Sequence, residues 1–129
     1  MITISKKVEY SVVFISYLAK DSQKTTSLTE AAKRLNLPYR FLGQLSMQLK
    51  QAGLVTSKEG KTGGYTLAPD WKNRSLYDLV EALGENKRMV KCLGDGVCKR
   101  QKECAMRGVW GKLETSFSNE LKKIKLNEL

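Results

Sequence analysis

The sequence predicts a mostly α-helical fold with one small β-hairpin and a long C-terminal helix. Apolar residues recur at helical spacing over most of the 129 residues. One glycine-rich stretch separates two short runs of strand-forming residues, which is typical of a hairpin. A segment of about twenty residues before the last helix lacks any regular pattern, which is typical of a functional or disordered loop.

Positive charge is unevenly distributed along the chain. Lysine and arginine outnumber aspartate and glutamate 23 to 13, and residues 1–75 hold 12 of the basic and 5 of the acidic groups. This surplus is typical of proteins that bind polyanions, although a solvated basic surface would show it too. No apolar run reaches the roughly 18 residues of a membrane span, and no leader is evident, so we expect a cytoplasmic protein that does not contact membranes.

The first helix is expected from Ser5 to Lys20. Val8, Val12 and Ile15 lie on one face, and other apolar residues are spread around the rest of the helix. Because apolar residues cover so much of the helix circumference, we expect the helix to be buried on two sides. A partner chain could cover one of them.

Two short helices follow. Ser27 begins the first as a cap for the amide of Glu30, whose carboxylate is expected to reach back. After a tight turn, Pro38 suits the first position of the next helix, and Gly53 suits its left-handed end. Two short helices joined by such a turn predict a helix-turn-helix, whose second helix enters the DNA major groove.

The outer face of that second helix carries residue types that read bases. Arginine forms paired hydrogen bonds with guanine, and glutamine forms them with adenine. The candidate DNA contacts on this helix are Tyr39, Arg40, Gln44 and Gln48, with Gly43 and Met47 on the same outer face. An ordinary surface helix is the alternative interpretation.

A basic hairpin comes directly after the helix-turn-helix. Strands are expected at 54–56 and 65–67, with a glycine-rich tip between them. Lys58 and Lys61 would contact phosphates or the minor groove. The hairpin therefore predicts the wing of a winged helix-turn-helix domain over residues 1–84.

The C-terminal part divides into a short capped helix, a loop and a long helix. Ser75 caps the short helix, which Gly84 ends. Residues 85–104 form the cysteine-rich loop, and residues 105–129 carry a helix with an apolar stripe at three- and four-residue spacing. We interpret that helix as a dimerisation helix, because a protein with a single helix-turn-helix domain usually binds two DNA half-sites as a dimer. Packing back on its own domain is the alternative.

Cys92, Cys98 and Cys104 are evenly spaced in a chain without histidine. Disulfides are disfavoured by the odd count, and structural zinc usually shows paired C-x2-C motifs or a histidine. Nearby lysines and arginines would lower thiol pKa values and balance an anionic iron–sulfur cluster, which is the favoured interpretation. Inert buried thiols and a redox-reactive cysteine stay open.

The whole chain resembles the IscR/NsrR type of winged-helix regulators (Rrf family), bacterial dimers that control transcription through an iron–sulfur cluster. The motifs that carry the resemblance are Ser5-Lys6, Tyr10, Phe41-Leu42-x-Gln44-Leu45, Gly53-Leu54-Val55, Gly63-Gly64-Tyr65, the three cysteines and Trp110. The resemblance implies sensing of iron–sulfur status, nitric oxide or redox state.

The resemblance also implies the ligands of a [2Fe-2S] or [4Fe-4S] cluster. IscR-type members place a histidine three residues after the third cysteine, where this chain has Arg107, which cannot donate a lone pair. NsrR-type members use a carboxylate near the start of the first helix, contributed by the other subunit, and the matching residue is Glu9. The implied ligand set is Cys92, Cys98 and Cys104 with Glu9 of the partner subunit. The alternative for Glu9 is a solvated charge paired with a lysine.

The expected function is a homodimeric transcription regulator, a repressor on a palindromic DNA operator, controlled by an iron–sulfur cluster. A regulator of the same fold that uses its cysteines for zinc or a thiol switch is the first alternative. An iron–sulfur electron carrier or cluster-delivery protein is the second. No catalytic residue is expected, since no general base with a nucleophile partner can be identified.

Overall fold

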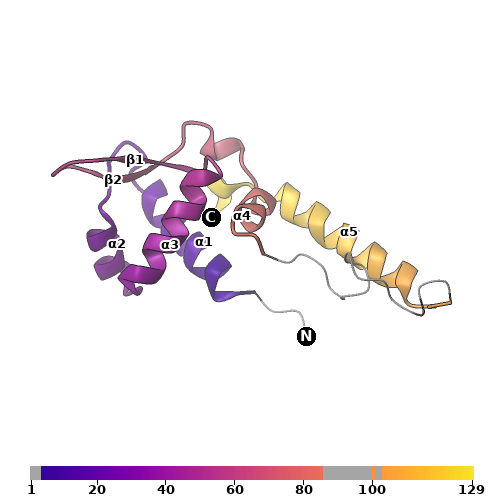
Figure 1. Ribbon diagram of the computed structural model, residues 1–129. Coiled ribbons are helices and arrows are strands. Elements are labelled where there is room, and N and C mark those ends of the chain that lie inside the picture. Colours follow the sequence, from indigo (N-terminus) through magenta and orange to yellow (C-terminus); the bar gives the residue numbers. More distant parts are fainter. Residues whose placement is uncertain (1–3, 86–99, 101–102) are drawn as a thin grey trace.

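The computed structural model describes residues 4–85, 100 and 103–129. These residues form a helical body with a projecting β-hairpin and a long final helix, so the predicted fold class is confirmed (Figure 1). The elements are α1 (Lys6–Ala19), α2 (Leu28–Leu35), α3 (Tyr39–Gln51), β1 (Val55–Lys58), β2 (Gly64–Leu67), the 3-10 helix η1 (Trp71–Asn73), α4 (Leu76–Ala82), α5 (Arg107–Lys123) and the 3-10 helix η3 (Leu126–Glu128). Over the described ranges, we find no helix with the length and apolar character that crossing a membrane requires.

The hydrophobic core lies where α1, α3 and α4 meet, closed by the base of the hairpin and by the end of the chain. Its fully buried side chains come from both ends of the sequence: Phe14, Ile15, Leu18, Leu42, Leu45, Leu49, Leu54, Val55, Leu79, Leu83 and Leu126. Burial of this apolar surface is the main force that holds the helices together. α3 is therefore held against the body along its whole inner face.

Serine side chains cap three of the helices, and two of these caps, Ser27 and Ser75, were predicted. Ser5 Oγ accepts a hydrogen bond from a first-turn amide of α1, and Ser27 Oγ accepts from the Glu30 amide at 3.1 Å. Ser75 and Asp78 form a complete capping box, in which each side chain accepts from the other residue's backbone N–H. Each cap satisfies an amide that has no partner inside the helix.

Two details of the predicted helix starts are wrong. The Glu30 carboxylate does not reach back to Ser27, because Tyr17 and Lys24 both donate to Glu30 Oε1 at 3.4 Å. Pro38 is the residue before α3 rather than its first residue, and its extended backbone leads into the helix at Tyr39. For Glu30, partners from α1 and the following loop compete with the local preference.

The final helix has two different halves. Its C-terminal half packs on α4, with Leu121 buried and Phe117 against the core. Its N-terminal half extends away from the body (Figure 1) and leaves Met106, Val109 and Leu113 each about 44–45% exposed. The C-terminal part of the predicted apolar stripe is therefore packed against the body, whereas its N-terminal part is exposed to solvent.

Candidate functional site

α2 and α3 form the predicted helix-turn-helix. α2 ends at Asn36, which takes the left-handed conformation (φ 55°), and the Leu37 amide donates to Ala32 O at 3.0 Å. Asparagine tolerates this conformation better than most residues. The turn brings the two helices into contact and presents the far side of α3 to solvent.

The predicted base-reading residues lie on the solvent side of α3. Tyr39, Arg40 and Gln44 are exposed and Gln48 is half-buried, whereas the leucines of the opposite face are at most 1% exposed. Phe41 is partly buried and packs edge-to-face on Tyr10 with ring centroids 5.4 Å apart. This contact joins α1 to the start of α3.

The hairpin is anchored to the loop between α1 and α2. Thr26 and Tyr65 exchange two backbone hydrogen bonds of 2.9 and 2.7 Å, and Thr66 Oγ1 donates to Ser22 O at 2.9 Å. β1 and β2 pair antiparallel with Val55 opposite Leu67. The wing thus has a fixed base, from which its tip projects (Figure 1).

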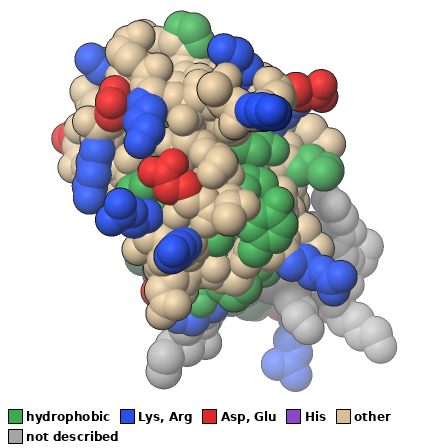
Figure 2. All heavy atoms as spheres, turned by 90° about the vertical axis from the view of Figure 1, so that its left-hand side faces the viewer, with side chains coloured by type: hydrophobic (Ala, Val, Ile, Leu, Met, Phe, Trp, Pro, Cys, Tyr) green, Lys and Arg blue, Asp and Glu red, His purple; other side chains and the backbone are tan. Residues whose placement is uncertain are grey.

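Lys58 and Lys61 are exposed toward the tip of this wing. Figure 2 shows many more basic than acidic side chains on the face that includes the wing side of the molecule. The exposed cations of α2, α3 and the wing that form no ion pair within the described ranges are Lys33, Arg34, Arg40, Lys50, Lys58 and Lys61. A helix and a wing that share unpaired cations suit a phosphate backbone.

Arg74 connects three parts of the fold. Its Nη2 donates to Ala52 O at the end of α3 (3.3 Å), and its Nε pairs with Asp70 Oδ2 (3.1 Å). The backbone of the same residue accepts from the Leu126 amide at 2.9 Å, beside the bond from the Leu76 amide to Ile124 O at 2.8 Å. Arg74 therefore contacts the end of α3 and the start of η3, and its neighbour Leu76 contacts the end of α5. No local sequence pattern marks Arg74 for this position.

The cysteine site is described in part. Cys92 and Cys98 lie outside the described residues. Cys104 is half-buried and forms no disulfide, and its carbonyl accepts a 3.4 Å hydrogen bond from the amide of Arg107 at the start of α5. Within the described ranges no three His, Cys, Asp or Glu side chains gather as metal ligands.

Glu9, the candidate fourth ligand, lies on the exposed side of α1. Its carboxylate pairs with Lys6 Nζ at 3.1 Å, and its side chain is 51% exposed. The hydrogen bond from Lys6 to Glu9, with the attraction between their charges, raises the pKa of Lys6. An exposed pair of this kind stabilises the fold little, so the carboxylate is available to a stronger partner.

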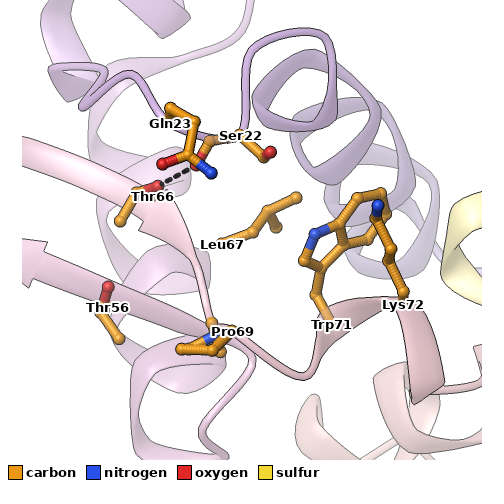
Figure 3. Close-up of a pocket in the computed structure, with 9 residues that line it drawn as sticks. Ser22, Gln23, Thr56, Thr66, Leu67, Pro69, Trp71 and Lys72 are labelled. Carbon is orange, nitrogen blue, oxygen red and sulfur yellow. Dashed lines mark hydrogen bonds between the residues drawn. The ribbon is translucent and has the colours of Figure 1, made fainter.

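A surface hollow of about 510 Å³ lies beside the base of the wing (Figure 3). Thr56 and Thr66 line it from the two strands, and Trp71 and Lys72 line it from η1. None of the predicted site residues is among its lining residues. The candidate nucleic-acid interface on α3 and the wing tip is thus separate from this hollow.

Sequence and structure comparisons agree with this arrangement. Residues 4–129 match the Rrf2 family model, described as an iron-dependent transcriptional regulator. The HTH-type transcriptional regulator IscR of Vibrio vulnificus is 32% identical over 127 residues, which span 98% of this chain and 76% of the relative. IscR of Escherichia coli is 28% identical and is matched over 98% of this chain and 78% of its own length.

Solved structures are similar as well. T. potens IscR superposes with a TM-score of 0.77 at 29% identity, covering 98% of this chain and 84% of the other. CymR, the global cysteine regulator of B. subtilis, gives 0.76 at 29% identity, covering 98% and 95%. These relatives are regulators and not enzymes. The chain therefore belongs to the Rrf2 family of helix-turn-helix transcriptional regulators.

Proposed function

We propose that the protein is a cytoplasmic homodimeric repressor whose binding to a palindromic operator is controlled by an iron–sulfur cluster. The observation that carries the proposal is the position of Cys104, three residues before α5. The other end of this helix is bonded to the backbone of residues 74–76, where Arg74 also contacts the end of α3. The signal would be iron–sulfur status, nitric oxide or redox state. The family's description as iron-dependent regulators supports this proposal.

The donor set fits a cluster. Cys92, Cys98 and Cys104 supply three thiols without any histidine in the chain, and thiolates are the usual ligands of iron–sulfur clusters. Glu9 of the partner subunit would complete the set, since its carboxylate is exposed and its pairing with Lys6 is weak. The cluster, when bound, supplies an iron center whose state or loss can be sensed. A carboxylate is a poor ligand for soft iron, so that position would be the exchangeable one.

Cys104 leads directly into the element that would carry the signal. A displacement at the start of α5 moves a helix whose far end is held by the backbone of residues 74–76. Arg74 also donates to Ala52 O at the end of α3, so the segment 74–76 contacts both the end of α5 and the end of the reading helix. The coupling is reciprocal. If a cluster favours one arrangement of α5, it would be bound more tightly when DNA binding selects the same arrangement.

Cys104→Ser is expected to remove most of the iron bound per chain, because one thiolate is lost. Glu9→Ala is expected to keep iron but to change the Mössbauer spectrum, because only the exchangeable ligand is lost. Iron content, anaerobic absorption and Mössbauer spectra of freshly purified protein measure both effects. Colourless, iron-free protein after reconstitution would contradict the iron–sulfur cluster. The proposal that the protein is a DNA-binding regulator would then stand without it.

Lys6→Ala is the matched control for Glu9→Ala. It removes the 3.1 Å ion pair but keeps the carboxylate. Unchanged spectra in Lys6→Ala together with changed spectra in Glu9→Ala would support ligation by Glu9. Equal effects of the two substitutions would make Glu9 only a partner of Lys6.

The proposed DNA contacts are Tyr39, Arg40, Gln44 and Gln48 on α3 with Lys58 and Lys61 on the wing. Arg40→Ala is expected to change sequence preference, by about 1–3 kcal/mol at the base pair that it reads. Lys61→Ala is expected to weaken binding to all sequences alike and to lower the salt slope by about one unit. Binding titrations on a panel of operator variants at several salt concentrations separate the two. An equal loss on every sequence for Arg40→Ala would contradict its base-reading role.

A thiol switch is the second candidate function. A similar structure, Staphylococcus aureus CymR, has been solved in an oxidized form at 27% identity and a TM-score of 0.71. Cys104 is half-buried and not in a disulfide, so its thiol could take part in such chemistry. Iron-free protein whose operator affinity changes on thiol oxidation would favour this candidate over the cluster.

A further inference from the structure

The center of the exposed face of α3 carries an apolar side chain. Leu42, Leu45 and Leu49 mark the inner face, since each is at most 1% exposed. At about 100° per residue, the direction opposite to these leucines falls on Arg40 and Met47, which lie within about 20° of one another around the helix. Met47 is 60% exposed, and both residues lie at the center of the outward face of α3.

The surroundings of Met47 are polar, so packing within the described chain does not explain it. Gln44 lies three residues earlier and is exposed, and Gln48 follows directly and is half-buried. Single exposed apolar residues are common on protein surfaces. This one, however, lies at the middle of the helix that a helix-turn-helix regulator inserts into the major groove.

The major groove offers one apolar group at the base edges, the C5-methyl group of thymine. We propose that Met47 reads thymine in the operator through contact with this methyl group. Gln44, one turn earlier on the same face, suits the adenine of the same or the adjacent base pair. The two side chains together would select an A·T step, with the amide bonding adenine and the thioether covering the methyl.

Gly43 makes room for this contact. A methionine side chain in a helix leans back over the residues three and four positions earlier, which here are Gln44 and Gly43. A Cβ added at Gly43 would have only Leu28 Cδ1 nearby, at 4.0 Å, so the position is open and holds no side chain. Met47 can therefore lie close along the helix, and its flexible thioether can adapt to the methyl.

The test removes the methyl group alone. Duplexes are enriched from a random pool with the full chain purified anaerobically, and each thymine of a half-site is then replaced singly by uracil, which keeps the hydrogen bonds. Wild-type protein is expected to lose about 4-fold in affinity at one or two of these positions, as for one buried methyl group. Met47→Ala should bind the thymine duplex with a similar loss and should no longer respond to uracil there, whereas Met47→Leu should still respond.

The inference rests on α3 reading DNA, and the outcomes separate the two claims. If no duplex is enriched, α3 does not bind specific DNA sequences, and both that proposed role and the inference about Met47 are wrong. If duplexes are enriched but uracil changes nothing at any position, Met47 does not read thymine although the regulator binds DNA. An equal loss for Met47→Ala on thymine and uracil duplexes would assign Met47 a role in packing or in contact with another protein.

Discussion

Gly64→Ala is expected to lower the melting temperature by roughly 10 °C, the largest effect on stability that we expect from a single methyl group in this chain. Gly64 has φ +150°, and a Cβ there would lie 2.2 Å from Thr26 O and 2.7 Å from the Ser27 amide nitrogen. Both neighbours are backbone atoms, and Thr26 O accepts a hydrogen bond in the bridge between Thr26 and Tyr65 that anchors the wing. Relieving the clash therefore requires that the bridge open, in addition to strain of about 1–3 kcal/mol from the backbone angle.

Gly111→Ala is the matched control. Gly111 lies within α5, has no atom within 4 Å of an added Cβ and has an ordinary helical backbone. Alanine is the better helix former by up to about 1 kcal/mol, so this variant should melt at the same or a higher temperature. Thermal unfolding at equal protein concentration measures both. A Gly64→Ala protein that melts within about 2 °C of the parent would contradict the close approach at the base of the wing.

Local chemistry allowed the helix ends to be predicted from the sequence. Ser27 and Ser75 each cap a helix as predicted, because the serine oxygen and the unpaired amide that it satisfies are three residues apart. Gly53 and Gly84 take positive φ where helices end, which follows equally from local backbone preference. Such features depend on nearby residues alone.

Contacts between distant segments could not be predicted. The Arg74 guanidinium reaches Ala52, and Lys125 pairs with Ser75 in an isolated bridge, but nothing in the sequence near either pair indicates its partner. Glu30 is a related case. The local capping rule predicts that its carboxylate bonds the start of its own helix, but the carboxylate accepts from Tyr17 of α1 instead. Tertiary geometry decides among several chemically acceptable partners.

The candidate DNA interface was predictable for a related reason. The outer face of α3 follows from helical periodicity once Leu42, Leu45 and Leu49 are assigned to the core. Met47 lies at the center of that face and could have been selected in the same way, but its apolar character did not indicate hydrogen bonding. The ligand set at the cysteines stays a prediction, since Cys92 and Cys98 fall outside the described residues.

Leu113→Glu is expected to dissociate the proposed dimer and to lower operator affinity by about 100-fold or more. Met106, Val109 and Leu113 form an exposed apolar stripe on the half of α5 that extends away from the body. A second copy of the helix would cover this stripe, and a carboxylate buried there without a partner would cost several kcal/mol. A dissociated protein binds half-sites one at a time and loses the gain of about 10²–10⁴ from linked binding.

Thr115→Glu adds the same charge on the opposite side of α5, where Thr115 is exposed and donates only to Gly111 O within its own helix. It should stay dimeric and keep its operator affinity. Sedimentation velocity at micromolar concentration and operator titrations measure the two properties for both variants. Dissociation by both substitutions, or by neither, would mean that the stripe is not the dimer interface. Loss of affinity by Leu113→Glu without dissociation would instead mean that α5 acts on the reading helix within one chain, through the segment 74–76 that contacts both.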